Sequence, residues 1–201
     1  MSGLRPFVLA LLALPLAACI SLFPKSEPAQ LYRFEISAPA APAPGPRATL
    51  MKTVTEFQRA AAGDRILTVG ANGEASYIAG SRWVSPASIL LDEQVQAAFR
   101  GSQRMRLVAR GEMARADYAL RLDVVRFETR YDHGPKAAPQ VVVELRAVIS
   151  RLSDHAVLGE HPFTASVRAA DNRVGAIVPA YSTAVSAVLS ELVAWTDTTG
   201  P

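Results

Sequence analysis

The chain has 201 residues, a formal net charge of +3 and a hydrophobic fraction of 50%. Its arginines are scattered singly and form no basic cluster, which argues against nucleic acid as a partner. Because it contains one cysteine, it can form neither an intramolecular disulfide nor a metal site built on thiolates.

The amino-terminal segment has the order of a signal peptide. One cation, Arg5, precedes an apolar run from Phe7 to Leu16. A transmembrane helix needs about 20 apolar residues, and this run is only about half as long. Residues 1–18 are therefore predicted to be a signal peptide that is removed, which leaves a mature chain long enough for a single domain.

Leu16, Ala17 and Ala18 directly precede Cys19, as in a bacterial lipobox. The Cys19 thiol is expected to accept diacylglycerol, and the amino group freed by cleavage to accept a further acyl chain such as palmitate. Two or three chains anchor stably, at about 0.8 kcal/mol per buried CH₂. No other cofactor is expected. The alternative is that Cys19 is an incidental residue of an ordinary signal peptide, or a small buried hydrophobic residue.

The residue after the cysteine bears on location. In Gram-negative lipoproteins an aspartate at this position favours retention in the inner membrane, and here it is Ile20. We therefore expect a lipid-anchored protein on the periplasmic face of the outer membrane. Residues 19–30 are predicted to be the lipidated cysteine and a tether, and residues 31–201 a single domain.

The first half of this domain is predicted to be mostly strands. A strand at Leu31–Ile36 is followed by a Pro/Ala-rich loop at 37–48, where prolines disfavour regular structure. Three further short strands with a turn at Gly70–Gly73 are expected in this half: Ala48–Val54, Arg65–Val69 and Ala75–Ala79.

A helix is predicted between Ser85–Pro86 and Gly101. Serine can cap the free amides of the first turn, and proline is tolerated there. Apolar residues fall at helical spacing on one face, whereas Asp92, Glu93 and Gln96 are expected to be exposed.

Alternating apolar residues predict strands at Tyr118–Val124 and Val141–Ile149, and a turn at Ser153–His155 joins the second to Val157–Val167 as a hairpin. A long amphipathic helix is predicted from Val174 to Trp195, with Pro179 either kinking it or marking its start. The expected fold class is α+β, with two helices packed on a mixed, largely antiparallel sheet.

The sequence lacks the usual catalytic motifs, including a nucleophile elbow, a phosphate loop and the metalloprotease helix motif. His133, His155 and His161 are interpreted as solvated, since two of them approaching across the hairpin would still lack a third metal ligand. Asp92 and Glu93 diverge by about 100° on a helix and cannot act as a carboxylate pair. We predict a protein that is not an enzyme.

Arg82 and Trp83 belong to an unusual string, Ser81–Pro86. The structural interpretation is a strand-to-helix corner in which Trp83 anchors the helix to the sheet. The alternative is a candidate partner surface or lipid-contact surface formed by Arg82 and Trp83, because both residue types are common at binding hot spots.

Several strings, in order along the chain, resemble a known family. They are Leu31–Phe34, Asp64–Leu67, Tyr77, Ser81–Trp83, Ser85–Pro86, Ala116–Leu120, Phe163 and a closing helix ending at Trp195. Together with the lipobox they resemble the ABC-type transport auxiliary lipoproteins, also called PqiC-like. The loop at 37–48 and Pro179 depart from the family pattern.

This resemblance implies a fold like that of the TolB N-terminal domain and a role beside a lipid-trafficking ABC system. The implied partners are an MCE-type periplasmic protein, a permease and an ATPase. The prediction is a non-catalytic docking component held at the membrane by Cys19. One alternative is a lipid-binding carrier with an apolar cavity between helices and sheet; another is an envelope hydrolase, disfavoured by the missing nucleophile and base.

Overall fold

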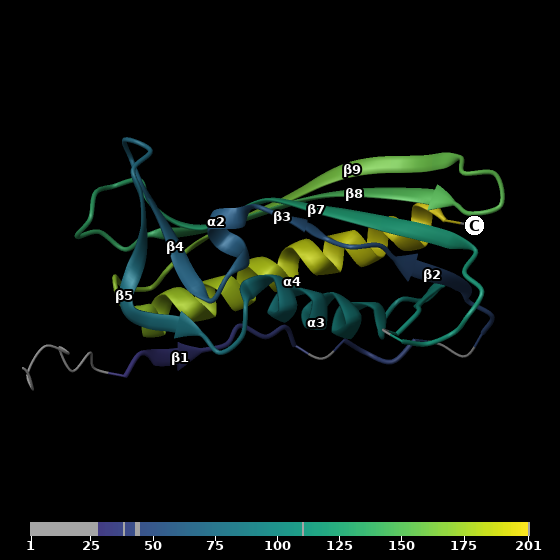
Figure 1. Cartoon of the computed structure of the whole chain (residues 1–201), viewed down its shortest axis with the longest axis horizontal. Helices are drawn as coiled ribbons and strands as arrows, with labels where there is room; N and C mark the ends of the chain where they lie inside the picture. Colours follow the sequence, from purple (N-terminus) through teal and green to yellow (C-terminus); the bar gives the residue numbers. More distant parts are fainter. Residues whose placement is uncertain (1–27, 38, 43–44, 110, 201) are drawn as a thin grey trace, which may run out of the picture.

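The computed structural model describes residues 28–37, 39–42, 45–109 and 111–200. These residues form a nine-stranded sheet with two long helices on one face (Figure 1). The strands are β1 (Gln30–Tyr32), β2 (Ala48–Lys52), β3 (Glu56–Phe57), β4 (Arg65–Gly70), β5 (Ala75–Trp83), β6 (Met105–Leu107), β7 (Tyr118–Tyr131), β8 (Gln140–Arg151) and β9 (Val157–Arg168). The helices are α2 (Arg59–Ala62), α3 (Ala87–Phe99) and α4 (Val174–Thr199).

Strand β7 is the central strand of the sheet and pairs with other strands on both of its edges. On one edge it pairs antiparallel with β8, which pairs antiparallel with β9. On the other edge it pairs in parallel with three short strands in succession, β2, β3 and β4. Strand β4 leads through antiparallel β5 to parallel β1, and β2 leads to parallel β6. The sheet is mixed, and its longest ladders are antiparallel, which confirms the predicted fold class.

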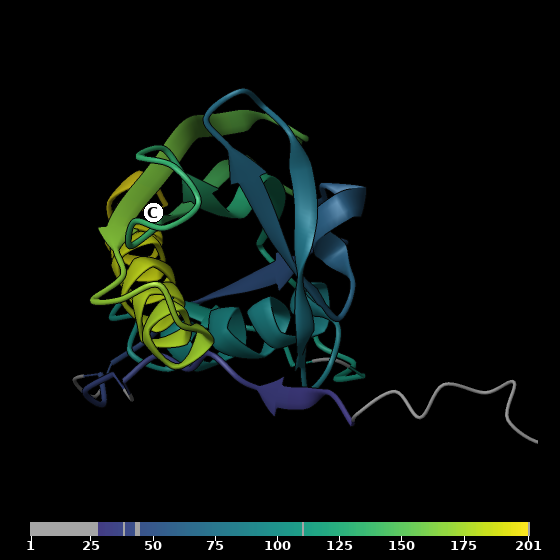
Figure 2. The ribbon, with the colours of Figure 1, turned by 90° about the vertical axis from the view of Figure 1, so that its left-hand side faces the viewer.

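The two predicted helices, α3 and α4, lie side by side against one face of the curved sheet (Figure 2). The one-turn helix α2 is an addition that the sequence analysis did not predict. Helix α4 is long and apolar enough to cross a membrane. Half of its apolar stretch is buried, and it packs against β8 and β9, as a core helix does.

Strand β7 is longer than predicted because it contains a β-bulge. Leu120, Leu122 and Val124 are buried as expected, but the register shifts between Val124 and Arg126. The extra residue moves the inward positions to the odd numbers, so that Phe127 and Thr129 are buried as well. A strict alternation of two residues therefore ends at Val124, although the strand continues to Tyr131.

The start of α3 differs from the prediction. Pro86 is the N-cap residue, and no side chain caps the helix. The prediction that Ser85 caps it is wrong, because the carbonyl oxygen of Gly63 accepts the amide of Ala87 at 2.9 Å and takes the place of a local cap. In α4, Pro179 lies inside the helix and does not mark its start at Val174.

Strand β1 ends at Tyr32, four residues earlier than predicted. The chain then leaves the sheet edge and crosses the outer side of the two helices (Figure 1). We call residues 33–37 the strap. Its crossing explains why an alternating pattern continues beyond the strand: Phe34 is fully buried and Ile36 partly, while Arg33 and Glu35 are exposed.

Candidate functional site

The predicted lipidation residues Leu16, Ala17, Ala18 and Cys19 lie outside the described residues. The described chain begins at residue 28 and enters the sheet two residues later as β1. Any attachment at Cys19 therefore acts on the domain through β1 and the strap, and the surroundings of these two segments form the candidate site.

The strap is fixed to the core by Phe34. Its ring is fully buried, and its centroid lies 5.1 Å from Trp83 in an edge contact and 5.3 Å from Phe127. Tyr181 on α4 completes this aromatic cluster, 5.1 Å from Trp83 and 4.9 Å from Phe127. Each such ring pair stabilises the fold by about 0.5–1.5 kcal/mol beyond the effect of its buried area. The cluster joins the strap, β5, β7 and α4.

The structure separates the two residues of the predicted partner surface. Trp83 is 2% exposed and packs in the aromatic cluster, as the structural interpretation proposed, so it offers no surface to a partner. Arg82 points outward, and its Nη1 lies 2.8 Å from Oδ2 of Asp64 in an ion pair that is about half exposed on both sides. Of the two predicted surface residues, Arg82 and Trp83, only Arg82 can contact a partner.

Two polar contacts hold the backbone of the strap. The amide of Glu35 donates to Oγ of Ser182 on α4 at 3.2 Å, and the amide of Ile36 donates to Oε1 of Gln94 on α3 at 3.0 Å. Gln94 is buried in spite of its polarity, which agrees with the rule that a buried amide is hydrogen-bonded. The strap therefore ties α3 to α4.

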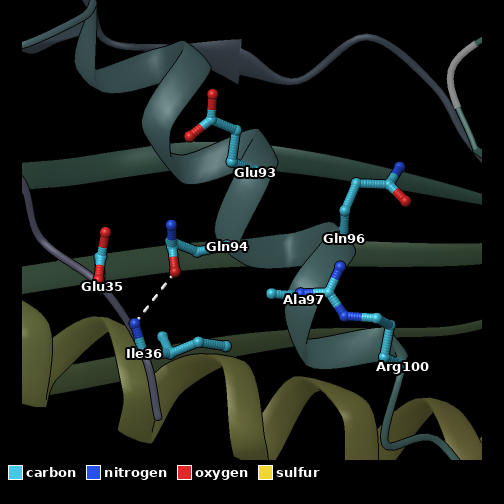
Figure 3. Close-up of a pocket in the computed structure, with 7 residues that line it drawn as sticks. All are labelled: Glu35, Ile36, Glu93, Gln94, Gln96, Ala97 and Arg100. Carbon is cyan, nitrogen blue, oxygen red and sulfur yellow. Dashed lines mark hydrogen bonds between the residues drawn. The ribbon is translucent and has the colours of Figure 1, made fainter. Parts of the chain in front are cut away.

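A cleft of about 460 Å³ opens between the strap and α3 (Figure 3). Its wall contains the hydrogen bond from Ile36 to Gln94, and it carries charges on Glu35, Glu93 and Arg100. The lining residues include no serine, cysteine or histidine. The cleft can bind a polar group, but its lining offers no hydroxyl, thiol or imidazole.

A second cleft, of about 410 Å³, lies between α4 and the end of the strap, and it shares Ile36 with the first cleft. Its lining includes the apolar residues Pro39, Ala40, Leu189 and Val193. Both clefts are on the outer side of the helices. The space between helices and sheet is filled by one continuous cluster of buried side chains.

The predicted exposure of Asp92 is wrong. Its Oδ1 lies 3.1 Å from Nζ of Lys52 and also accepts a hydrogen bond from Oγ1 of Thr55 at 3.0 Å. The Lys52 side chain is only 10% exposed, so this pair links β2 to α3 in a partly buried setting. Helical periodicity marked Asp92 as polar but could not reveal a cation on a distant strand.

The histidines are not brought together. His155 is in the turn before β9, with a positive φ of 59°, whereas His161 pairs with Ala147 in the middle of that strand and stacks on Trp195. His133 is in the connection between β7 and β8. Among the described residues, no group of three His, Cys, Asp or Glu is placed to hold a metal ion.

Gln94 and Ser182 are the site residues that sequence reasoning missed. Both are polar residues within the amphipathic helices, and a polar residue on such a helix is ordinarily assigned to the solvent side. The only available signal was that Gln94 lies between the core residues Leu91 and Val95. That signal indicates a buried amide but gives no partner.

Comparisons with known proteins identify the family of this chain and solved structures with the same fold. A family model described as the ABC-type transport auxiliary lipoprotein component matches residues 32–193. A solved structure from Xanthomonas campestris is 29% identical over 85% of this chain and 96% of that chain, with a TM-score of 0.72. A Chlamydia trachomatis protein shares the fold at 9% identity, covering 76% and 97% of the two chains, with a TM-score of 0.54. A comparison with curated proteins gives no match.

Proposed function

The chain belongs to the family of ABC-type transport auxiliary lipoprotein components, and on this basis we propose that it is a docking component of a lipid-transporting ABC system. It is anchored by acyl chains on Cys19 to the outer membrane and faces the periplasm. Its partners are an MCE-type periplasmic protein with its permease and ATPase.

The observation that carries this proposal is the extent of the family match. It runs from β1 to α4, and so includes the strap, the sheet and both long helices. The lipobox at Leu16–Cys19 stands directly upstream, at the place where an auxiliary lipoprotein requires it. A lipid anchor followed by a single domain suits a protein whose role is to hold a partner at a membrane.

A non-catalytic role is supported by the chemistry of the candidate site. The polar groups of the strap and of α3 are engaged in holding the chain, as in the contact of Gln94 with Ile36. The cleft beside them is lined by carboxylates, amides and an arginine, with no hydroxyl, thiol or imidazole. In this proposal, therefore, the protein acts by placing its partners, and the ATPase supplies the energy.

The carrier alternative required an apolar cavity between helices and sheet. That region holds Leu120, Leu122, Tyr181 and Val188, each fully buried within one cluster. The two clefts beside the strap open on the outer side of the helices instead. The filled interior favours docking over carriage.

The test compares the native chain with Cys19→Ser, using Ser21→Ala in the tether as a matched control. In cells that express the MCE protein, permease and ATPase, the native chain and Ser21→Ala should carry the mass of a cleaved, acylated protein. Both should fractionate with the outer membrane and recover the MCE protein in a pull-down. Cys19→Ser should lose all three properties. An unmodified, uncleaved leader on the native chain, or acylation without recovery of any transport component, would contradict the proposal.

A further inference from the structure

The tether limits how far the domain can move from a membrane. The chain between Cys19 and the first residue of β1, Gln30, spans at most about 40 Å when fully extended. If Cys19 carries the anchor, as proposed above, β1 is the described element that always lies closest to the lipid along the chain. The outer face of β1 and its partner strand is therefore the first surface to consider for membrane contact.

This outer face is defined by strand register. Leu31 pairs with Arg82 and Tyr32 with Trp83, and the amide of Val84 donates to the carbonyl of Tyr32 at 2.8 Å, which continues the ladder. Trp83 points into the core, so the alternate positions Leu31 and Arg82 point outward.

Three apolar residues of this face are exposed. Leu31 is 61% exposed, Val84 47%, and Ile89, in the first turn of α3 directly after this strand, 44%. Leu31 and Val84 lie on neighbouring segments at the end of the tether, and Ile89 follows five residues after Val84. Large aliphatic side chains exposed there are costly in water. An interfacial layer of lipid would remove part of that cost.

Two cations accompany these apolar side chains. Nη1 of Arg33 lies 3.5 Å from Oε1 of Glu35, and Arg82 pairs with Asp64, yet both guanidinium groups remain about half exposed. A guanidinium has five N–H donors in a planar fork, so each can bind its carboxylate and still donate to a phosphate oxygen. Aliphatic side chains flanked by arginines are the composition of a surface that rests on phospholipid headgroups.

We propose that the face formed by Leu31, Arg33, Arg82, Val84 and Ile89 rests on the membrane surface that holds the lipid anchor. The proposal depends on acylation of Cys19. Because the anchor makes this contact intramolecular, its effective concentration is in the millimolar range and a weak contact is sufficient. The membrane contact fixes the orientation of the domain and presents the opposite end, with the β6–β7 and β8–β9 connections, toward the periplasm (Figure 1).

The test uses a photoreactive benzophenone amino acid in the full-length chain, placed either at Val84 or at Met113. Met113 is a fully exposed apolar residue in the connection before β7, at the other end of the molecule, and is the matched control. After illumination of native membranes, mass spectrometry measures both the acyl groups on Cys19 and phospholipid adducts. We expect at least fivefold more phospholipid adduct from position 84 than from position 113.

A second variant tests the apolar contact itself. Leu31→Glu with Ile89→Glu, both surface changes, should reduce the adduct at position 84 at least threefold, while the near-ultraviolet circular dichroism of the buried Trp83 stays unchanged. Equal adduct yields at positions 84 and 113 on acylated protein, or cross-links from position 84 to a protein in place of lipid, would overturn the membrane-facing surface and leave the proposed function intact. Absence of acyl groups on Cys19 would overturn both.

Discussion

The hydroxyl of Tyr181 on α4 and that of Thr129 on β7 lie 3.1 Å apart, and both residues are fully buried. This hydrogen bond sits inside the aromatic cluster that includes Trp83 and Phe127. Burial raises the pKa of Tyr181 well above its ordinary value of 10.0, because the phenolate would be desolvated, and the nearby charge of Glu128 adds to the effect. The pair is a polar contact within the apolar junction of helix and sheet.

Removing both hydroxyls of this pair should cost less stability than the sum of removing each one alone. Tyr181→Phe leaves the Thr129 hydroxyl buried without its partner, and we expect a loss of about 1–3 kcal/mol in the free energy of unfolding. Thr129→Val should cost a similar amount, and the double variant less than the sum of the two. Urea denaturation of the four proteins provides the measurement. Strict additivity would show that the two hydroxyls are not coupled.

The raised pKa of Tyr181 predicts an alkaline limit to stability. Above pH 10 the unfolded chain ionises this tyrosine, whereas the folded chain keeps it protonated until its higher pKa is reached. The stability that the protonated Tyr181 gives the folded chain is therefore fully present below pH 10 and is lost as the pH rises beyond it. Denaturation midpoints measured at increasing pH should fall less steeply for Tyr181→Phe than for the native chain. Parallel curves would refute this assignment.

The ion pair of Lys52 with Asp92 should contribute to stability although Asp92 is next to the exposed Glu93 on α3. In Asp92→Asn the Lys52 ammonium keeps its contacts with Thr53 and Thr55 but loses its counter-charge in a partly buried position. We expect a cost of roughly 1–3 kcal/mol, measured by chemical denaturation. The exposed neighbour Glu93 is the control: Glu93→Gln should stay within about 0.5 kcal/mol of the native chain. Equal effects of the two changes would contradict the structural role of Asp92.

Gly101 is required by a close approach of the chain that follows the strap. A Cβ at this position would lie 2.6 Å from Cβ of Pro39 and 3.2 Å from the carbonyl oxygen of Ala40. Gly101→Ala should therefore displace this segment and speed hydrogen exchange of the amides of Glu35 and Ile36. At Gly63 a Cβ meets no atom within 4 Å, so Gly63→Ala should leave these amides protected. Unchanged exchange in Gly101→Ala would show that the contact yields without consequence.

The elements that sequence analysis placed well are those whose pattern is local. The hairpin of β8 and β9 and the helix α4 keep their periodicity through most of their length, and their turn residues agree with it. The elements that it misplaced depend on distant partners. The extent of β7 depends on a bulge after Val124, and the start of α3 depends on the carbonyl of Gly63. Neither feature can be recognised from the residues next to it in the sequence.

The candidate site divides in the same way. The buried role of Trp83 followed from its place at a strand-to-helix corner, whereas the role of Gln94 depends on a strap that is 58 residues away in sequence. The strap itself was hidden because its alternating residues imitate a strand. A segment that packs across helices through every second side chain cannot be told from a strand by alternation alone.

The burial of Phe34 directly after a three-residue strand has a mechanical consequence. A load applied through the amino end of the domain first meets the hydrogen bonds of β1, which are few. Further extension must then pull an aromatic ring out from between Trp83 and Phe127. Tension arising at the membrane would thus strain the junction of helix and sheet, and would not simply peel away a loose terminus.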